Sequence, residues 1–228
     1  MASKEMYALG SQASVIRDLF AYGQEQAAIV GKENVFDFSI GNPTVSAPAC
    51  VKEAIEDILE TRESVAIHGY TAASGDASVR QGLADYMNQT YDAQVRADNF
   101  YMTCGAAASL TISLKALVEG PDDKIILIAP FFPEYTVFVH NANAKAVVLP
   151  PDTEHFQISL DALEKAITPH TRAIIINSPN NPSGVVYSAD TYEKLAALLT
   201  RKSQEIGHPI YIISDEPYRE IIYDGLPI

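Results

Sequence analysis

The sequence predicts an α/β fold built around a mainly parallel sheet. Short runs of apolar, β-branched residues alternate along the chain with longer segments of helical periodicity, an order typical of parallel sheets. Two of these runs, residues 172–177 and 209–214, are separated by one helix-like segment. We therefore expect them to be consecutive parallel strands of a βαβ unit.

Composition narrows the class of protein. The chain has 228 residues, 47% of them hydrophobic, which is enough for a sizeable core. Its formal charge of −13 argues against nucleic acid or an anionic membrane as a partner, because both attract basic patches. No apolar run approaches the ~20 residues of a membrane helix, and the N-terminus lacks an apolar signal core. With two cysteines and no metal-ligand spacing, we expect a soluble cytoplasmic protein without a metal site.

The N-terminal part of the chain predicts three helices and one strand. The helices are expected at residues 11–30, 48–61 and 77–90, and the strand at residues 35–40. Gly31 is expected to end the first helix, because glycine commonly follows the last helical residue. A small-residue loop is expected at residues 69–75.

The rest of the chain predicts further strands and helices in alternation. Besides the two strands named above, strands are expected at residues 100–103, 124–129 and 144–149, and helices at residues 106–118 and 160–167. The helix at 106–118 carries Leu110, Leu114, Leu117 and Val118. Their spacing places them on one apolar face.

Polar motifs follow the two consecutive strands. Asn177-Ser-Pro-Asn-Asn-Pro-Ser-Gly184 follows one strand and Ser214-Asp-Glu-Pro-Tyr218 follows the other. Ligands of parallel sheets bind at the carboxyl ends of the strands, so Asn181, Asp215 and Tyr218 are predicted to converge on one crevice. A carboxylate can hold a ring nitrogen protonated, while an amide and a phenol bind a ring oxygen beside it. Pyridoxal phosphate needs both contacts, because it accepts electrons only while its pyridine nitrogen keeps a proton.

A third motif, Thr103-Cys-Gly-Ala-Ala-Ala-Ser109, joins a strand to a helix. Gly105 allows the backbone to come close to a ligand, and the first free amides of the helix favour a phosphate. Alone, the motif would favour a tight strand-to-helix turn packed with small side chains. Beside the two downstream motifs, it predicts a phosphate site.

The three motifs, in this order, resemble those of the class I/II aminotransferases, the fold type I pyridoxal-phosphate enzymes. The resemblance implies a three-layer αβα fold with a mainly parallel sheet, incomplete at the C-terminus. It implies phosphate binding by Gly105, Ala106 and Ala107, mainly through backbone amides. It also implies that Phe132, in Pro130-Phe-Phe-Pro-Glu-Tyr135, stacks on the pyridine ring.

Two further residues are assigned by the resemblance. Tyr70 matches a family tyrosine that reaches the cofactor phosphate of the neighbouring subunit, which implies a homodimer. Gly41 matches the loop that approaches the substrate carboxylate. The structural alternatives are a tyrosine packed under a loop and a turn glycine with positive φ.

The resemblance also identifies what the chain lacks. The family's Schiff-base lysine follows the aspartate–tyrosine motif and is expected beyond Ile228, as is the arginine that binds the substrate carboxylate. The chain therefore resembles a truncated enzyme: residues 1–45 an N-terminal arm and part of the small domain, residues 46–228 the large cofactor domain. The large-domain sheet is expected to lack its last two strands, which in the family lie between strands 100–103 and 210–214. Alone, the 228 residues are expected to be inactive.

The favoured function is an aminotransferase that moves an amino group from an amino acid to a 2-oxo acid by a ping-pong mechanism. A pyridoxal-phosphate-dependent C–S or β-eliminating lyase, or a decarboxylase, is the alternative within the same fold, because these activities share the cofactor contacts. A non-catalytic remnant is a third possibility. A cofactor-binding sensor of a transcription regulator is less favoured, since no basic helix-turn-helix precedes Gly41.

Overall fold

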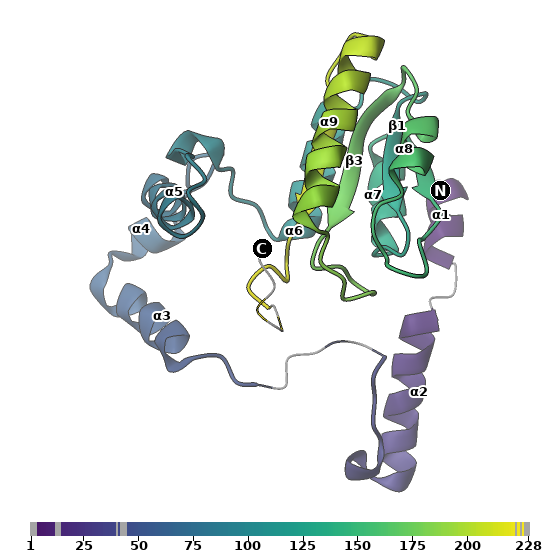
Figure 1. The fold of residues 1–228 in the computed structure, drawn as a ribbon. Coiled ribbons are helices and arrows are strands. Elements are labelled where there is room, and N and C mark those ends of the chain that lie inside the picture. The colour runs from purple at the N-terminus through teal and green to yellow at the C-terminus, as the bar shows by residue number, and fades with distance from the viewer. Residues whose placement is uncertain are drawn as a thin grey trace. The chain divides into compact units, whose positions relative to one another are not determined.

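The computed structural model of the protein describes residues 4–11, 15–39, 41, 45–221, 223 and 225 (Figure 1). The chain divides into two compact units, Met1–Tyr70 and Thr71–Ile228. This division does not test whether residues 1–45 and 46–228 are separate domains, so that assignment stays a prediction. None of the described helices is both long and apolar enough to cross a membrane.

The first unit is helical. Its elements are α1 (Lys4–Ser11), α2 (Val15–Val30), the 3₁₀ helix η1 (Lys32–Asn34), α3 (Ala49–Thr61) and α4 (Ser64–His68). Gly31, with φ +90°, follows α2 as predicted. The prediction of a strand at residues 35–40 is wrong for residues 35–39, the described part, because none of them pairs with a strand. Phe36 and Phe38 are largely exposed there, and an apolar run becomes a strand only with a partner.

The second unit contains a four-stranded parallel sheet of order β2-β1-β3-β4. The strands are β1 (Lys124–Ile128), β2 (Lys145–Leu149), β3 (Thr171–Asn177) and β4 (Tyr211–Asp215). Its helices are α5 (Ala77–Tyr91), the 3₁₀ helix η2 (Ala97–Asn99), α6 (Ala106–Leu117), α7 (Glu134–Asn141), α8 (Leu160–Ala166) and α9 (Ala189–Ile206). The βαβ unit of β3, α9 and β4 is confirmed. Helix α7 was not predicted.

Helices cover both faces of the sheet, which confirms the three-layer αβα prediction (Figure 1). Alternate side chains of a strand point to opposite faces, and two separate apolar clusters result. One cluster joins Ile174 of β3 to Leu163 of α8 and Leu195 of α9. The other joins Ile175 to α6 and α7. Each fully buried side chain of this size contributes roughly 1.5–3 kcal/mol.

The strand expected at residues 100–103 is also wrong. The segment follows η2 and makes no ladder with the sheet, although the Met102 amide donates to the Ser74 carbonyl at 3.0 Å. Strand β4 is the last strand in the sheet that the structure describes. Tyr211 and Ile212 of β4 are exposed as a consequence, so this edge offers unpaired backbone groups.

Helix α6 runs antiparallel to the strands. It ends at Leu117, and only the turn at 118–123 separates it from the start of β1. Leu110 and Leu114 of α6 pack in the same cluster as residues of β1 and β3. The C-terminal end of α6 therefore lies at the amino edge of the sheet, and its N-terminal end at the carboxyl edge.

A buried carboxylate anchors the amino edge. Asp123, just before β1, is 4% exposed. Its Oδ2 accepts from the amides of Glu119 and Gly120 at 2.7 and 3.2 Å, and its Oδ1 lies 3.0 Å from Arg172 Nε. Burial opposes ionisation, but these amides and the guanidinium outweigh it and lower the pKa of Asp123.

Replacing Asp123 with alanine is expected to lower the free energy of unfolding by about 3 kcal/mol, because Arg172 and two amides lose a buried partner. The folded-state pKa of Asp123 is depressed, so its stabilisation is present at neutral pH. It is lost as the pH falls below the unfolded value of ~3.9 toward the folded one. Urea unfolding at neutral and acid pH measures both effects. The control is Asp122→Ala, whose exposed pair with Lys145 contributes little; an equal loss in both variants would contradict the prediction.

Candidate active site

The carboxyl ends of β3 and β4 lie side by side at one edge of the sheet. Asn177 ends β3, Asp215 ends β4, and the two are register partners. Asn177 Nδ2 donates to the Asp215 backbone oxygen at 2.7 Å, and Asn177 Oδ1 accepts from the Asn181 amide at 2.7 Å. One side chain thus connects two of the three residues that the sequence predicted to converge.

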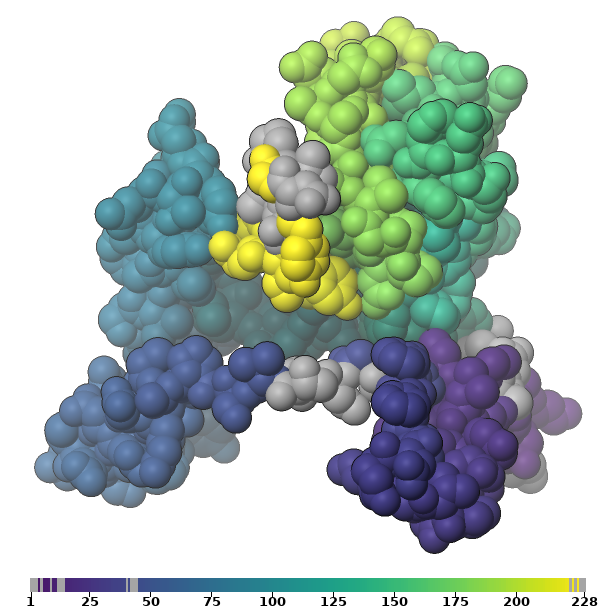
Figure 2. Space-filling view, turned by 60° about the horizontal axis from the view of Figure 1, so that its bottom comes forward, coloured from purple at the N-terminus to yellow at the C-terminus, as the bar shows by residue number. Residues whose placement is uncertain are grey.

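The third predicted residue joins the same cluster. Asn181 Nδ2 donates to Tyr218 Oη at 3.1 Å. In the space-filling view the yellow segment after β4 lies beside the light-green residues that follow β3 (Figure 2). Asn181 is exposed and Tyr218 is half-buried, so a ligand can reach both. Because Tyr218 accepts from Asn181, its own hydroxyl proton is free to be donated to such a ligand.

The segment that carries Tyr218 is also held by α5. Tyr86 Oη donates to Glu220 Oε1 at 3.0 Å. The guanidinium of Arg219 lies 4.7 Å from the centroid of the Tyr91 ring, within range of a cation–π contact. These contacts fix the chain directly after Tyr218.

Asp215 is held by a buried phenol that the sequence did not predict. Tyr135 of α7 donates from its Oη to Asp215 Oδ2 at 2.5 Å and is 2% exposed. Burial, followed by the hydrogen bond to Asp215, raises the pKa of Tyr135 above its ordinary value, so the phenol stays a donor. Asp215 Oδ1 makes none of the hydrogen bonds found among the residues that the structure describes, and it is available to a ligand.

Two aromatic rings lie against Tyr135. Phe132 meets it edge to face, with centroids 5.8 Å apart at an interplanar angle of 82°, and Phe131 stacks on it at 6.3 Å. Phe132 is partly exposed, unlike Tyr135. Phe132, which the sequence predicted to stack on the pyridine ring, therefore lies next to Tyr135, the hydrogen-bond partner of Asp215.

The N-terminal end of α6 lies at this edge, and its first residues, 105–107, are open to a ligand. We call these residues the cradle. Gly105 is the N-cap, with φ +88° and ψ 169°, a conformation that is essentially confined to glycine. Nothing lies within 4 Å of where a Cβ of Gly105 would stand. The amides of Ala108 and Ser109 donate to the Gly105 carbonyl, whereas the amides of Ala106 and Ala107 have no acceptor among the described residues. Free amides at a helix N-terminus suit an anion.

The model of the family described as aminotransferase class I and II matches residues 33–227. The chain belongs to this family. The predicted membership is confirmed, and it implies pyridoxal phosphate as the cofactor.

Curated relatives and solved structures agree with the family. The aspartate aminotransferase of Rhizobium meliloti (strain 1021) is 30% identical over 204 residues, 88% of this chain and 47% of that protein. The probable N-acetyl-LL-diaminopimelate aminotransferase of Bacillus subtilis (strain 168) is 28% identical over 193 residues, 84% and 46% of the two proteins. An aminotransferase crystal structure from Eubacterium rectale, 56% identical with a TM-score of 0.97, is matched over 100% of this chain and 57% of that one. The chain spans about half the length of the curated relatives it matches.

The carboxyl edge of the sheet carries groups of the kinds that the cofactor of this family needs. The cradle at Gly105 suits a phosphate, the Asp215 carboxylate suits a protonated ring nitrogen, and the Asn181–Tyr218 pair suits a ring oxygen. Helices α6 and α7 pack in one cluster on one face of the sheet, so the cradle and Tyr135 lie on the same face. The donor set therefore has the chemistry that a flat, phosphorylated ligand with a basic ring nitrogen requires.

The aminotransferase family also uses a lysine, and the described lysines lie elsewhere. Lys124 and Lys145 begin β1 and β2 at the opposite edge of the sheet. The others in the second unit are on helices: Lys115, Lys165, Lys194 and Lys202. The lysine expected beyond Ile228 stays a prediction.

Tyr70 and Gly41 belong to the first compact unit, and their roles stay predictions. The Tyr70 side chain is fully exposed, so it is not packed under its loop. Gly41 has nothing within 4 Å of a Cβ position. Its neighbours, Ile40 and residues 42–44, lie outside the described residues.

Sequence reasoning missed the roles of Tyr135 and Asn177, although both stand inside the motifs that it identified. Tyr135 has Val139 at i+4, and both face the core. That spacing is the signal that could have revealed α7. Asn177 is the polar end of a buried strand, a position that requires a hydrogen-bond partner.

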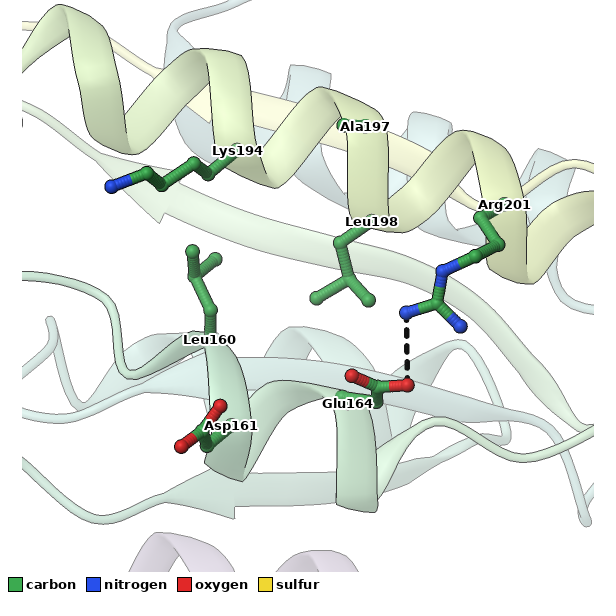
Figure 3. A pocket seen from close by; sticks show the side chains of 7 residues that line it. All are labelled: Leu160, Asp161, Glu164, Lys194, Ala197, Leu198 and Arg201. Atoms are coloured by element: carbon green, nitrogen blue, oxygen red, sulfur yellow. Dashed lines mark hydrogen bonds and ion pairs between the residues drawn. The ribbon is translucent and has the colours of Figure 1, made fainter.

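A hollow of about 400 Å³ lies between α8 and α9 (Figure 3). These two helices pack on the face of the sheet opposite α7. Three of its charged side chains are paired: Glu164 accepts from Arg201 at 2.8 Å, and Lys194 pairs with Asp190 at 2.6 Å. The groove shares no residue with the cluster around Asp215. It is not the candidate active site.

Proposed function

We propose that the protein carrying this chain is a pyridoxal-phosphate-dependent aminotransferase, transferring an amino group from an amino acid to a 2-oxo acid by a ping-pong mechanism. The observation that carries the proposal is the Asp215 carboxylate, held by buried Tyr135 beside the hydrogen-bonded pair Asn181–Tyr218. When bound, the cofactor supplies an electron sink for the reacting carbon of the amino acid.

The site residues have separate tasks in this proposal. Asp215 holds a proton on the pyridine nitrogen. Asn181 and Tyr218 donate hydrogen bonds to the ring oxygen. Phe132 covers one face of the ring, where an offset aromatic contact restrains a flat ligand.

The phosphate is assigned to the cradle at the start of α6. The backbone amides of Ala106 and Ala107, which have no acceptor in the part of the chain that the structure describes, donate to its oxygens. Gly105 keeps the backbone close, since its position has open space in front of it. The partial positive charge of the helix end adds to the attraction.

A homodimer is part of the same proposal. Tyr70 contacts the cofactor phosphate of the partner subunit, a role that its full exposure within its own unit supports. Gly41 approaches the substrate carboxylate. A cytoplasmic location stays a prediction from the sequence.

The names of the relatives favour transamination over elimination or decarboxylation. They include aspartate, N-acetyl-LL-diaminopimelate, aspartate/prephenate and aromatic-amino-acid aminotransferases. Lyases and decarboxylases of this fold share the cofactor contacts, so the three reactions are separated by their products.

We expect the purified full-length protein that carries this chain to take up pyridoxal phosphate, seen as visible absorbance, and to form glutamate from 2-oxoglutarate and at least one amino acid. Aspartate, aromatic and basic amino acids are tested as donors, and ammonia and carbon dioxide are measured in parallel. Release of ammonia or carbon dioxide without glutamate would establish the lyase or decarboxylase instead. Failure to take up the cofactor at all would defeat the assignment.

A further inference from the structure

Asn177 makes hydrogen bonds with both ends of its side-chain amide. Its Nδ2 donates to the carbonyl of Asp215, and its Oδ1 accepts from the amide of Asn181, each at 2.7 Å. The residue is only 4% exposed. Both bonds are therefore shielded from water, and losing either leaves a polar backbone group without its partner.

The position of Asn177 explains why a side chain makes this connection. It is the last residue of β3 and pairs in register with Asp215, the last residue of β4. The backbone ladder of the sheet stops at this point. Beyond it the chain enters the loop at 178–188, which carries Asn181. No ladder hydrogen bond fixes that loop against β4.

We propose that Asn177 is a positioning residue that sets the distance between Asn181 and Asp215. The inference rests on the proposed function, in which these two residues contact the ring oxygen and the ring nitrogen of one rigid cofactor. Two contacts on a rigid ring need a fixed separation, and small misplacements of reacting groups are costly in rate.

The two hydrogen bonds of the Asn177 side chain require an amide. An amide donates and accepts at the same time, whereas a carboxylate only accepts. Asn177→Asp therefore keeps the bond from Asn181 but loses the bond to the Asp215 carbonyl, at almost unchanged volume. Asn177→Ala removes both bonds without adding a charge and leaves space that a water can occupy.

Asn180 offers a matched control in the same motif. It is 7% exposed, and its amide is also used at both ends. Its Nδ2 donates to the Pro130 carbonyl at 3.3 Å, and its Oδ1 accepts from the amide and hydroxyl of Ser183 at 3.0 and 2.8 Å. Among the described residues the Asn180 side chain hydrogen-bonds to neither Asn181 nor Asp215, so its variants report the general cost of losing a buried amide.

The experiment is done on the full-length protein and compares the wild type with Asn177→Asp, Asn177→Ala, Asn180→Asp and Asn180→Ala. Apo-protein is titrated with pyridoxal phosphate, and kinetics are measured with the best amino-acid donor of the wild type. Both Asn177 variants are expected to weaken cofactor binding about tenfold and to lower kcat at saturating cofactor by about 10- to 100-fold. KM for the donor stays within about threefold, because ground-state binding of the donor is not the interaction removed. The Asn180 variants are expected to change kcat less than about threefold.

The outcomes separate this inference from the proposed function. If the wild type neither binds the cofactor nor transaminates, the proposed function fails. If the wild type is active and the Asn177 and Asn180 variants lose kcat equally, Asn177 has no positioning role. Failure of both Asn177 variants to fold, beside folded Asn180 variants, would assign Asn177 to stability alone and likewise overturn the inference.

Discussion

Replacing Asp215 with asparagine is expected to lower kcat by about 100-fold or more, while the dissociation constant of pyridoxal phosphate rises far less. Asparagine keeps an oxygen that can accept from Tyr135, so the local packing is retained. It carries no charge, however, and cannot hold a proton on the ring nitrogen. The lost interaction strengthens as negative charge develops in the transition state, and such a loss raises the barrier by about 3 kcal/mol.

Two comparisons make the Asp215 prediction specific. Glu216→Gln removes a neighbouring carboxylate that pairs with Arg219 at 2.9 Å, and we expect little change in kcat. A cofactor analogue methylated on the ring nitrogen is permanently cationic, so it needs no carboxylate and should restore part of the activity of Asp215→Asn. Near-wild-type turnover of Asp215→Asn with the natural cofactor would show that Asp215 is not the partner of the ring nitrogen.

The sequence was sufficient to predict the sheet edge that carries the site. Strands β3 and β4 each contain consecutive isoleucines, residues 174–176 and 212–213, and the one amphipathic helix between them favours a parallel arrangement of neighbours. Their carboxyl ends then lie at the same edge of the sheet. This arrangement predicts, from the sequence alone, that Asn181, Asp215 and Tyr218 lie together. The hydrogen bonds of Asn181 and Asn177 confirm this meeting.

The remaining contacts depend on chain packing that no local pattern records. Tyr135 and Asp215 are 80 positions apart in the sequence, and their contact exists because α7 packs on the same face as the Asp215 side chain. The wrong strand predictions at 35–40 and 100–103 have the same cause. Their apolar pattern is suitable for a strand, but a strand also needs a neighbouring strand to pair with, and the described residues provide none.

Replacing Gly105 with alanine is expected to weaken pyridoxal phosphate binding about 100-fold, or about 2.7 kcal/mol. Alanine at φ +88° and ψ 169° costs about 1–3 kcal/mol in backbone strain. Relieving this strain turns the free amides of Ala106 and Ala107 away from the phosphate. The new methyl group also enters the space that is open in front of Gly105.

Gly207→Ala is the matched control for Gly105. Gly207 caps α9 with φ +84°, has nothing within 4 Å of a Cβ position, and precedes β4 at the amino edge of the sheet. Its replacement has a similar conformational cost, about 1–2 kcal/mol, but should leave the cofactor dissociation constant unchanged.

Inorganic phosphate gives a second measurement on the same variants. It should compete with pyridoxal phosphate for the wild type and for Gly207→Ala, and lose this competition in Gly105→Ala. Once saturated with cofactor, Gly105→Ala should recover most of the wild-type kcat, because the phosphate anchor binds ground state and transition state alike. This result is opposite to that expected for Asp215→Asn, where binding is retained and rate is lost. If Gly105→Ala and Gly207→Ala weakened binding equally, the end of α6 would have no special part in holding the phosphate.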